Sequence, residues 1–323
     1  IQATSQALYD LDHPREYVPK SIEVQRACMK EREFYVAFLE KLEKLKAVSA
    51  SNLKNLGKIL NYNIENNIHF YRITSALIPL VTHPEVGYWG HREFLKKDFE
   101  YIGKLINESN MRVDTHPDEF NVINSINPKV VENTKINLLR QAQWFEDFKY
   151  DLGKMVIHIG GATNGKESGI ERFITNFKTF PEEVTSKIII ENDDKTYTAK
   201  ETLFLCNELK RPMVLDIHHH NCNNANTNIY DLIPYIFATW KNEKLPPKLH
   251  FSSPRDSEND RKHSDFINAQ DFVNFLENIK HFNTDIDIML ECKEKDLALF
   301  KLADDIKELK PEYTWIDQST FIV

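Results

Sequence analysis

Histidines and acidic residues follow seven short apolar runs of this sequence, each near the point where the run ends. Imidazole and carboxylate groups without cysteine suit Mn²⁺, Zn²⁺ or Fe²⁺ better than Ca²⁺ or a structural zinc. Such ions can acidify a water molecule and stabilise charge on a phosphate group. Because the candidates exceed the needs of one ion, the pattern predicts two or three clustered ions. The candidate ligands are His83, His116, His158, Glu191, Asp216, His219, His250 and Glu291.

Some of these side chains also have a purely structural explanation. At most one or two of the three histidines 218–220 can face inward, because neighbouring side chains diverge on a strand or turn. Asp216 and a residue three positions later can converge where a strand meets a loop, which selects His219. Glu191 and Glu291 end apolar runs, where a buried carboxylate requires either a metal or an ion-pair partner. Structural salt bridges are therefore the alternative for these two glutamates.

The apolar runs themselves predict a parallel α/β protein. They contain largely β-branched or aliphatic residues without clean alternation, as expected for strands that are buried on both faces. Longer segments with helical spacing lie between them, and successive runs begin 25 to 44 residues apart. This repeat is typical of a (β/α)8 TIM barrel, whose active site lies at the carboxyl ends of the strands. The predicted strands are residues 69–74, 111–116, 155–161, 187–192, 212–218, 248–253 and 287–292.

The first strand of such a barrel is not evident. Residues 31–46 read as a charged amphipathic helix, and a strand at residues 33–38 is a weaker alternative. We therefore expect the first strand to lie upstream of Ile1 or at residues 1–4. No composition break marks a second domain. The sequence divides into an N-terminal segment, residues 1–48, and a TIM-barrel catalytic domain, residues 49–323.

Composition excludes several classes of protein. The 323 residues carry 41 basic and 49 acidic side chains, a net charge of −8 that rules out a basic nucleic-acid-binding coat. A nucleic-acid substrate stays possible, because carboxylates that hold cations present a positive cluster to phosphate. No apolar run approaches the ~20 residues of a membrane span. Four cysteines without a CxxC pair fit a reducing compartment, so we expect a cytoplasmic protein without membrane association.

Motifs of other enzyme classes are missing from the sequence. Gly160-Gly161-Ala162 could form a phosphate loop, but no GxGxxG or Walker pattern accompanies it. There is no G-x-S-x-G elbow, which argues against a serine hydrolase of the α/β type. Cys206 and Cys292 lie at positions unsuited to a nucleophile.

The motifs at the predicted strand ends resemble the UV damage endonuclease family over roughly residues 49–302. Three of them carry most of the specificity, in this order and spacing. They are Glu191 to Tyr197 (ENDDKTY), Asp216 to His219 (DIHH) and Lys248 to Pro254 (KLHFSSP). The motifs YRITS at residues 71–75 and HPDEF at residues 116–120 add to the likeness.

The resemblance implies a TIM barrel related to the endonuclease IV type of nuclease. It implies a DNA repair enzyme that nicks damaged double-stranded DNA on the 5′ side of pyrimidine photodimers, with divalent ions that are typically manganese; Mg²⁺, Zn²⁺ and Fe²⁺ are the other candidates. The eight ligands named above fall on the family's metal positions. Catalytic roles fall on Glu191, Lys248 and His263. Family members can carry a carboxylated lysine at the position of Lys248, and His263 falls near the phosphate.

One departure concerns recognition of the lesion. The family often has Gln-Tyr after its His-Pro motif, a pair that probes the DNA opposite a lesion, and here the pair is Glu119-Phe120. Phenylalanine keeps a stacking face, whereas the glutamate lacks the neutral amide donor and adds repulsion.

We expect a monomer without an obligate protein partner.

Three other functions fit parts of the pattern. A sugar isomerase or epimerase uses histidine and carboxylate metal sites on the same barrel, normally with one or two ions. An abasic-site endonuclease would use the same chemistry on a different lesion. A metal-storing or DNA-binding module would need no catalytic water at all.

Overall fold

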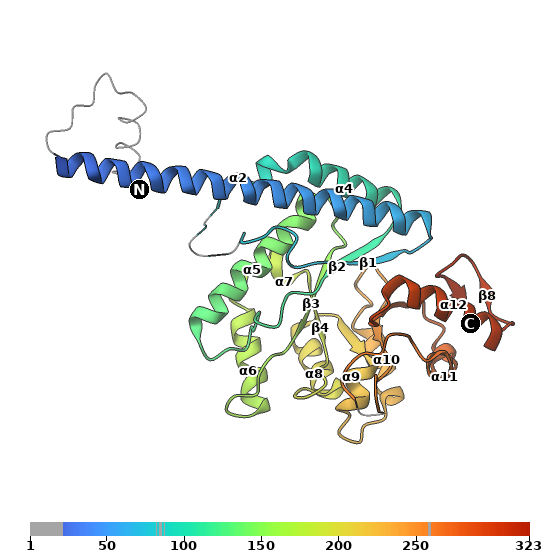
Figure 1. Cartoon of the computed structure of the whole chain (residues 1–323). Coiled ribbons are helices and arrows are strands. Elements are labelled where there is room, and N and C mark those ends of the chain that lie inside the picture. Colours follow the sequence, from blue (N-terminus) through green and yellow to red (C-terminus); the bar gives the residue numbers. More distant parts are fainter. Residues whose placement is uncertain (1–21, 82, 84–85, 87, 258–259) are drawn as a thin grey trace.

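The computed structural model describes residues 22–81, 83, 86, 88–257 and 260–323 (Figure 1). It contains one parallel sheet of seven strands in the order β1 to β7, so each strand pairs with its neighbours in sequence. All seven predicted strands are confirmed. Their bounds are β1 Phe70–Ile73, β2 Arg112–Thr115, β3 Lys154–His158, β4 Ile188–Glu191, β5 Met213–Asp216, β6 Lys248–Phe251 and β7 Asp287–Leu290.

Helices connect the strands and cover the outside of the sheet, as in a TIM barrel (Figure 1). Parallel strands require such crossover connections, and the helices bury the outward apolar side chains. The α-helices are α2 Ile22–Glu65, α3 His91–Phe94, α4 Lys96–Glu108, α5 Pro128–Asp147, α6 Lys166–Phe177, α7 Glu182–Thr185, α8 Ala199–Leu209, α9 Ile217–Cys222, α10 Ile233–Ala238, α11 Ala269–Ile279 and α12 Lys295–Leu309. Two 3₁₀ turns, η1 Ile229–Asp231 and η2 Lys280–Phe282, complete them.

Helix α2 shows whether residues 33–38 form a helix or a strand. It runs without a break through residues 33–38, so the alternative of a strand there is wrong. A strand at residues 1–4 falls outside the described residues. The helix also continues across residues 48 and 49, and its later part packs on α4 through Leu53, Leu56 and Leu60. Assignment of residues 1–48 to a separate segment stays a prediction.

Half of the barrel interior is apolar. Side chains alternate between the two faces of a strand, so Ile157, Ile190 and Leu215 join the large core under the helices. Their neighbours Val156, Ile189 and Val214 point the other way and pack with Trp240 in a separate buried cluster. This cluster lies in the interior beside β3, β4 and β5, directly beneath the last residues of these strands.

The other half of the interior is charged. Arg112 of β2 donates to Asp287 of β7 at 2.6 Å, and its guanidinium lies 5.2 Å from the centre of the Trp240 ring. Lys248 of β6 forms a hydrogen-bonded ion pair with Asp114 of β2, and the two side chains are 0% and 1% exposed. Burial lowers the pKa of Lys248 to about 8, although Asp114 opposes this shift. These pairs link β2 to β6 and β7 through the centre of the barrel.

A β-hairpin formed by the C-terminal residues of the sequence contacts the barrel. Strands β8 Thr314–Trp315 and β9 Phe321–Ile322 pair antiparallel. In the turn between them, Asp317 accepts a hydrogen bond from His69 at 2.7 Å and Ser319 donates to the carbonyl of Asn67 at 2.5 Å. The hairpin is thus fixed to the residues that lead into β1. Within the described residues, no helix has the length and apolar character needed to cross a membrane.

The buried Lys248–Asp114 pair makes a prediction about stability. Asp114→Asn leaves the lysine charge without a counter-ion in the interior, so we expect the free energy of unfolding to fall by about 3 kcal/mol or more at pH 7. Urea denaturation followed by circular dichroism measures the change. The double variant Asp114→Asn/Lys248→Met should recover most of the loss, because it removes both charges together.

A matched control is Asp305→Asn, which breaks the exposed pair with Lys301 on α12. We expect this variant to lose less than about 1 kcal/mol. Equal losses from Asp114→Asn and Asp305→Asn would contradict a structural role for the buried pair.

Candidate metal centre

The candidate ligands meet at one rim of the barrel because the strands are parallel. Strands β3, β4 and β5 end at His158, Glu191 and Asp216. His158 stands beside Glu191 in the β3–β4 register, and Asp216 stands beside His250 in the β5–β6 register. His116 and Glu291 directly follow β2 and β7. The carboxyl ends of six neighbouring strands therefore supply the site.

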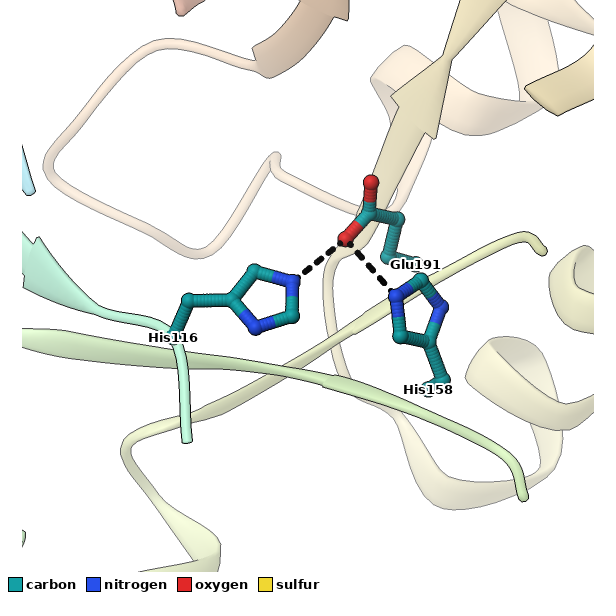
Figure 2. Close-up of side chains that lie close together, drawn as sticks. All are labelled: His116, His158 and Glu191. Carbon is teal, nitrogen blue, oxygen red and sulfur yellow. Dashed lines mark hydrogen bonds and ion pairs between the residues drawn. The ribbon is translucent and has the colours of Figure 1, made fainter. Parts of the chain in front are cut away.

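Glu191 is the centre of this arrangement, and its side chain is only 1% exposed. Its Oε2 atom lies 3.0 Å from Nε2 of His116 and 3.6 Å from Nε2 of His158 (Figure 2). Its Oε1 atom lies 2.7 Å from Nδ1 of His250 and 3.6 Å from Nδ1 of His219. Four imidazoles from four different elements thus surround one buried carboxylate.

Two overlapping groups of side chains have the spacing of a metal site. His116, His158 and Glu191 form the first group, and Glu191, Asp216, His250 and Glu291 form the second. In each group the potential ligand atoms lie within 4.8 Å of one another. The shared Glu191 would let two ions sit next to each other.

The buried polar atoms fit divalent cations. Oδ2 of Asp216 is buried and has no hydrogen-bond partner, while Oδ1 accepts only the backbone N–H of His219 at 2.7 Å. Nδ1 of His158 is likewise buried without a partner. A buried carboxylate oxygen without a donor is costly, and a bound cation would satisfy it. Nitrogen and oxygen ligands without sulfur match manganese, zinc or ferrous iron.

The pKa values at the site follow from burial and mutual contacts. Burial would raise the pKa of Glu191, but the contacts with His250, His158 and His116 prevail and hold it well below its usual range. Burial lowers the pKa of His250 to about 4, so its ring is neutral. Burial also disfavours the charged ring of His219, yet Asp216 and Glu191 outweigh it and raise its pKa to about 9.

Asn192 fixes the positions of two candidate ligands, Asp216 and His219. Its side-chain amide donates to the carbonyl of Asp216 at 2.9 Å and accepts from the N–H of Asp216 at the same distance. Its own carbonyl lies 3.0 Å from Nδ1 of His219. A hydrogen bond from Nδ1–H to a carbonyl selects the tautomer whose other nitrogen is a ligand. The ENDDKTY motif thus supplies a ligand and the group that orients two others.

The histidine run resolves as the spacing predicts. His219 faces Glu191, whereas His218 lies buried against the ring of His263, with centroids 5.4 Å apart. His220 is buried and belongs to neither ligand group. The ligand role of His219 itself stays a prediction.

Other predicted site residues lie farther from the two groups. His83 is exposed in the loop after β1 and belongs to neither group. His263 contacts Ser252 at 2.8 Å, and its Nε2 is 3.8 Å from Glu291. The Lys248 amine forms its ion pair with Asp114 one layer of side chains below the rim. Phe120 is 65% exposed in the loop after β2, next to the exposed Glu119.

Sequence reasoning missed two charged residues of the interior, Arg72 and Asp114. Nη2 of Arg72 lies 2.5 Å from Oε1 of Glu291 and 3.1 Å from Nε2 of His250. The salt-bridge alternative for Glu291 is thus realised alongside its place in a ligand group. A charged residue within an apolar strand was the feature that could have identified them. Because side chains alternate between the two faces of a strand, each of these residues is expected to point into the barrel.

A parallel barrel with imidazoles and carboxylates gathered at its carboxyl rim defines the class of TIM-barrel metal-site proteins. The family model of UV-endonuclease UvdE matches residues 24–318. The chain therefore belongs to the UV-endonuclease UvdE family, as the motifs predict.

Individual relatives agree with this assignment. A UV DNA damage endonuclease of Halalkalibacterium halodurans is 38% identical over 269 residues, 83% of this chain and 84% of the relative. One of Bacillus mycoides is 38% identical over 276 residues, 84% of this chain and 86% of that protein. The crystal structure of SacUVDE superposes with a TM-score of 0.76 at 32% identity, covering 83% of this chain and 89% of the other.

The fold likeness extends further than the family. Endonuclease IV from Thermus thermophilus superposes with a TM-score of 0.52 at 12% identity, over 78% of this chain and 94% of that one. This likeness shows the TIM-barrel fold alone. Family membership, by contrast, decides for the endonuclease over the sugar isomerase or epimerase.

The raised pKa of His219 predicts proton release on metal binding. With a pKa of about 9 the ring is protonated at pH 7, and it must lose this proton to become a ligand. We expect the apparent Mn²⁺ affinity to rise up to about tenfold per pH unit between pH 7 and 9 and then to level off. Titration calorimetry in two buffers of different ionisation enthalpy counts the released protons. A binding enthalpy that is independent of the buffer would contradict the release of a proton from His219 on metal binding.

Proposed function

We propose that this protein nicks damaged double-stranded DNA on the 5′ side of UV photoproducts by metal-assisted hydrolysis. The observation that carries the proposal is the buried Glu191 carboxylate within 3.6 Å of four imidazole nitrogens, beside the unsatisfied oxygen of Asp216. Membership of the UV-endonuclease UvdE family supports DNA as the substrate. The proposal assigns catalysis to residues 49–323 of a monomer in the cytoplasm.

Two or three divalent ions, most simply Mn²⁺, would bind at the rim. His116, His158 and Glu191 would hold one ion, and Glu191, Asp216, His250 and Glu291 would hold a second. His219 would complete one of these shells, and the proposal keeps His83 as a ligand from the loop after β1. Bound ions would supply Lewis-acid stabilisation of the phosphate and a more acidic water.

The proposal gives His263 a role at the phosphate. Its Nδ1 lies 2.8 Å from the hydroxyl of Ser252, which fixes the ring, and Nε2 faces the rim beside Glu291. Burial lowers the pKa of His263, although Glu291 opposes the shift. A neutral ring there can accept a proton or bond to a phosphate oxygen.

Lys248 has two possible roles, and the structure bears on the choice. A carboxylated lysine would be an anionic bridge between ions, whereas a free amine is a cation. Here the amine is paired with Asp114 below the rim. In this arrangement Lys248 is a cation that supports the ligand layer from beneath.

Phe120 and Glu119 form the proposed contact with the lesion. They follow His116 in a loop that is tied to the loop after β1 by a 2.8 Å hydrogen bond from Ser75 to Asp118. Exposed aromatic rings stack on unpaired bases without regard to sequence. A photodimer is already poorly stacked, so its extrusion from the duplex costs less than that of intact bases.

Removal of the central carboxylate tests the metal mechanism. We expect Glu191→Gln to lower the nicking rate on UV-irradiated duplex by about a hundredfold or more, because it deletes a ligand common to both groups. EDTA should abolish nicking by the wild type, and added Mn²⁺ should restore it. Gel analysis of an end-labelled duplex with one photodimer measures the rate and the position of the cut.

Two controls accompany this experiment. Glu308→Gln changes an exposed carboxylate of α12 and should leave the rate unchanged. Undamaged duplex should remain intact. Activity of Glu191→Gln at the wild-type level would rule out the proposed centre, and equal cutting of undamaged DNA would rule out lesion selectivity.

The stacking role of Phe120 gives a separate prediction. Phe120→Ala should weaken binding to dimer-containing duplex by about 1–3 kcal/mol, roughly fivefold to 150-fold, whereas Phe120→Tyr should keep it. Fluorescence anisotropy with a labelled duplex measures the affinity. The control Phe204→Ala removes an aromatic ring of α8 that is 54% exposed, and it should have no effect on the affinity. Wild-type affinity of Phe120→Ala would place lesion contact elsewhere.

A further inference from the structure

Arg72 is a permanent positive charge inside the candidate metal centre. It extends from β1 into the barrel, and its Nη2 atom contacts Oε1 of Glu291 at 2.5 Å and Nε2 of His250 at 3.1 Å. Both partners belong to the second ligand group, and neither belongs to the first. Arginine stays protonated at any pH at which the protein is folded. The two ligand groups therefore differ in the fixed charge that stands next to them.

The guanidinium is held at the second group by its contacts with Glu291 and His250, and the Arg72 side chain is 28% exposed. Arg72 is paired in the β1–β2 register with Asp114, and its Nε atom is buried without a hydrogen-bond partner. Below it lies the Lys248 ammonium on Asp114, so the space deeper in the barrel already holds a cation. The Glu291 carboxylate offers a counter-charge at the rim. An ion held by Oε1 of Glu291 would share that oxygen with Arg72, which also contacts Nε2 of the neighbouring His250.

We propose that Arg72 sets the metal affinity of the second ligand group, so that the centre contains two unequal sites. The site of His116, His158 and Glu191 is tight, and the site of Glu191, Asp216, His250 and Glu291 is weak. The cause is repulsion between like charges, together with competition for one oxygen of Glu291. This inference rests on the proposed metal-dependent function and adds a residue that tunes it.

The test is a titration of the protein with Mn²⁺ alone. The electron paramagnetic resonance signal of aqueous Mn²⁺ disappears on binding, so its amplitude gives stoichiometry and dissociation constants without any substrate. We expect the wild type to show a tight and a weak class of site. In Arg72→Gln the weak class should tighten by about tenfold to a hundredfold, the order expected for removing a unit charge a few ångströms away. The tight class should change by less than about threefold.

Two further variants separate charge from shape. Arg72→Lys keeps the positive charge and should leave the weak class weak. Arg112→Gln breaks a similar interior pair with Asp287, one layer deeper and without contact to a candidate ligand, and should leave both classes unchanged. Circular dichroism of each variant verifies the fold.

The outcomes distinguish the inference from the function on which it rests. A wild type that binds no Mn²⁺ contradicts the proposed function. A wild type with a single class of site overturns the inference alone, and this result needs no variant. Unchanged or weakened binding in Arg72→Gln also overturns it, because Arg72 would then merely orient Glu291. Tightening in both Arg72→Gln and Arg112→Gln would show a loss of packing and would likewise overturn it.

Discussion

The interior of this barrel depends on one electrostatic requirement, that every charge removed from water must be compensated nearby. An isolated ion in a protein interior is expensive, whereas a paired and hydrogen-bonded ion is tolerated. The four lysine and arginine side chains of the seven strands each have an acidic partner elsewhere in the chain. The pairs are Arg72–Glu291, Arg112–Asp287, Lys154–Glu243 and Lys248–Asp114. Glu191 instead relies on imidazoles, and this exception marks the candidate metal centre.

The division of the interior into two halves explains how the site can be both charged and well ordered. Beside β3 to β5 the base is apolar, with Val156, Ile189 and Val214 packed on Trp240. These strands present His158, Glu191 and Asp216 directly above that packed layer. The charged half supports the remaining ligands through ion pairs, which are directional. Packing thus positions the candidate ligands of one half, and ion pairs position those of the other.

Much of the fold could be predicted from sequence because it depends on local patterns. Buried parallel strands read as continuous apolar runs, and the rule that sites form at their carboxyl ends then brought most candidate ligands together. Selection of His219 from the run of three histidines followed from the same geometry. The weaker strand at residues 33–38 is wrong, because a short apolar run such as residues 34–38 fits a strand and a helix segment equally well by pattern alone.

The partners of interior charges could not be predicted. Alternation shows that Arg72 and Asp114 point inward, but it carries no information about which distant residue they meet. Arg72 and its partner Glu291 are 219 positions apart in the sequence. Lys248 and its partner Asp114 are 134 positions apart. The same limit hid the depth of Lys248. The family resemblance implies a catalytic role for this residue, and in the structure its amine pairs with Asp114 beneath the rim.

The C-terminal hairpin has a consequence for the synthesis of the chain. Its turn is fixed to the residues before β1 by two hydrogen bonds, from His69 to Asp317 and from Ser319 to the carbonyl of Asn67. The partners in these bonds are 248 and 252 positions apart in the sequence, so the entry into β1 is secured by residues that are translated much later. Contacts of such long range slow folding, since the intervening chain must first be ordered. The entry into β1 therefore stays without these two anchors until residues 317 and 319 have been synthesised and have folded back onto it.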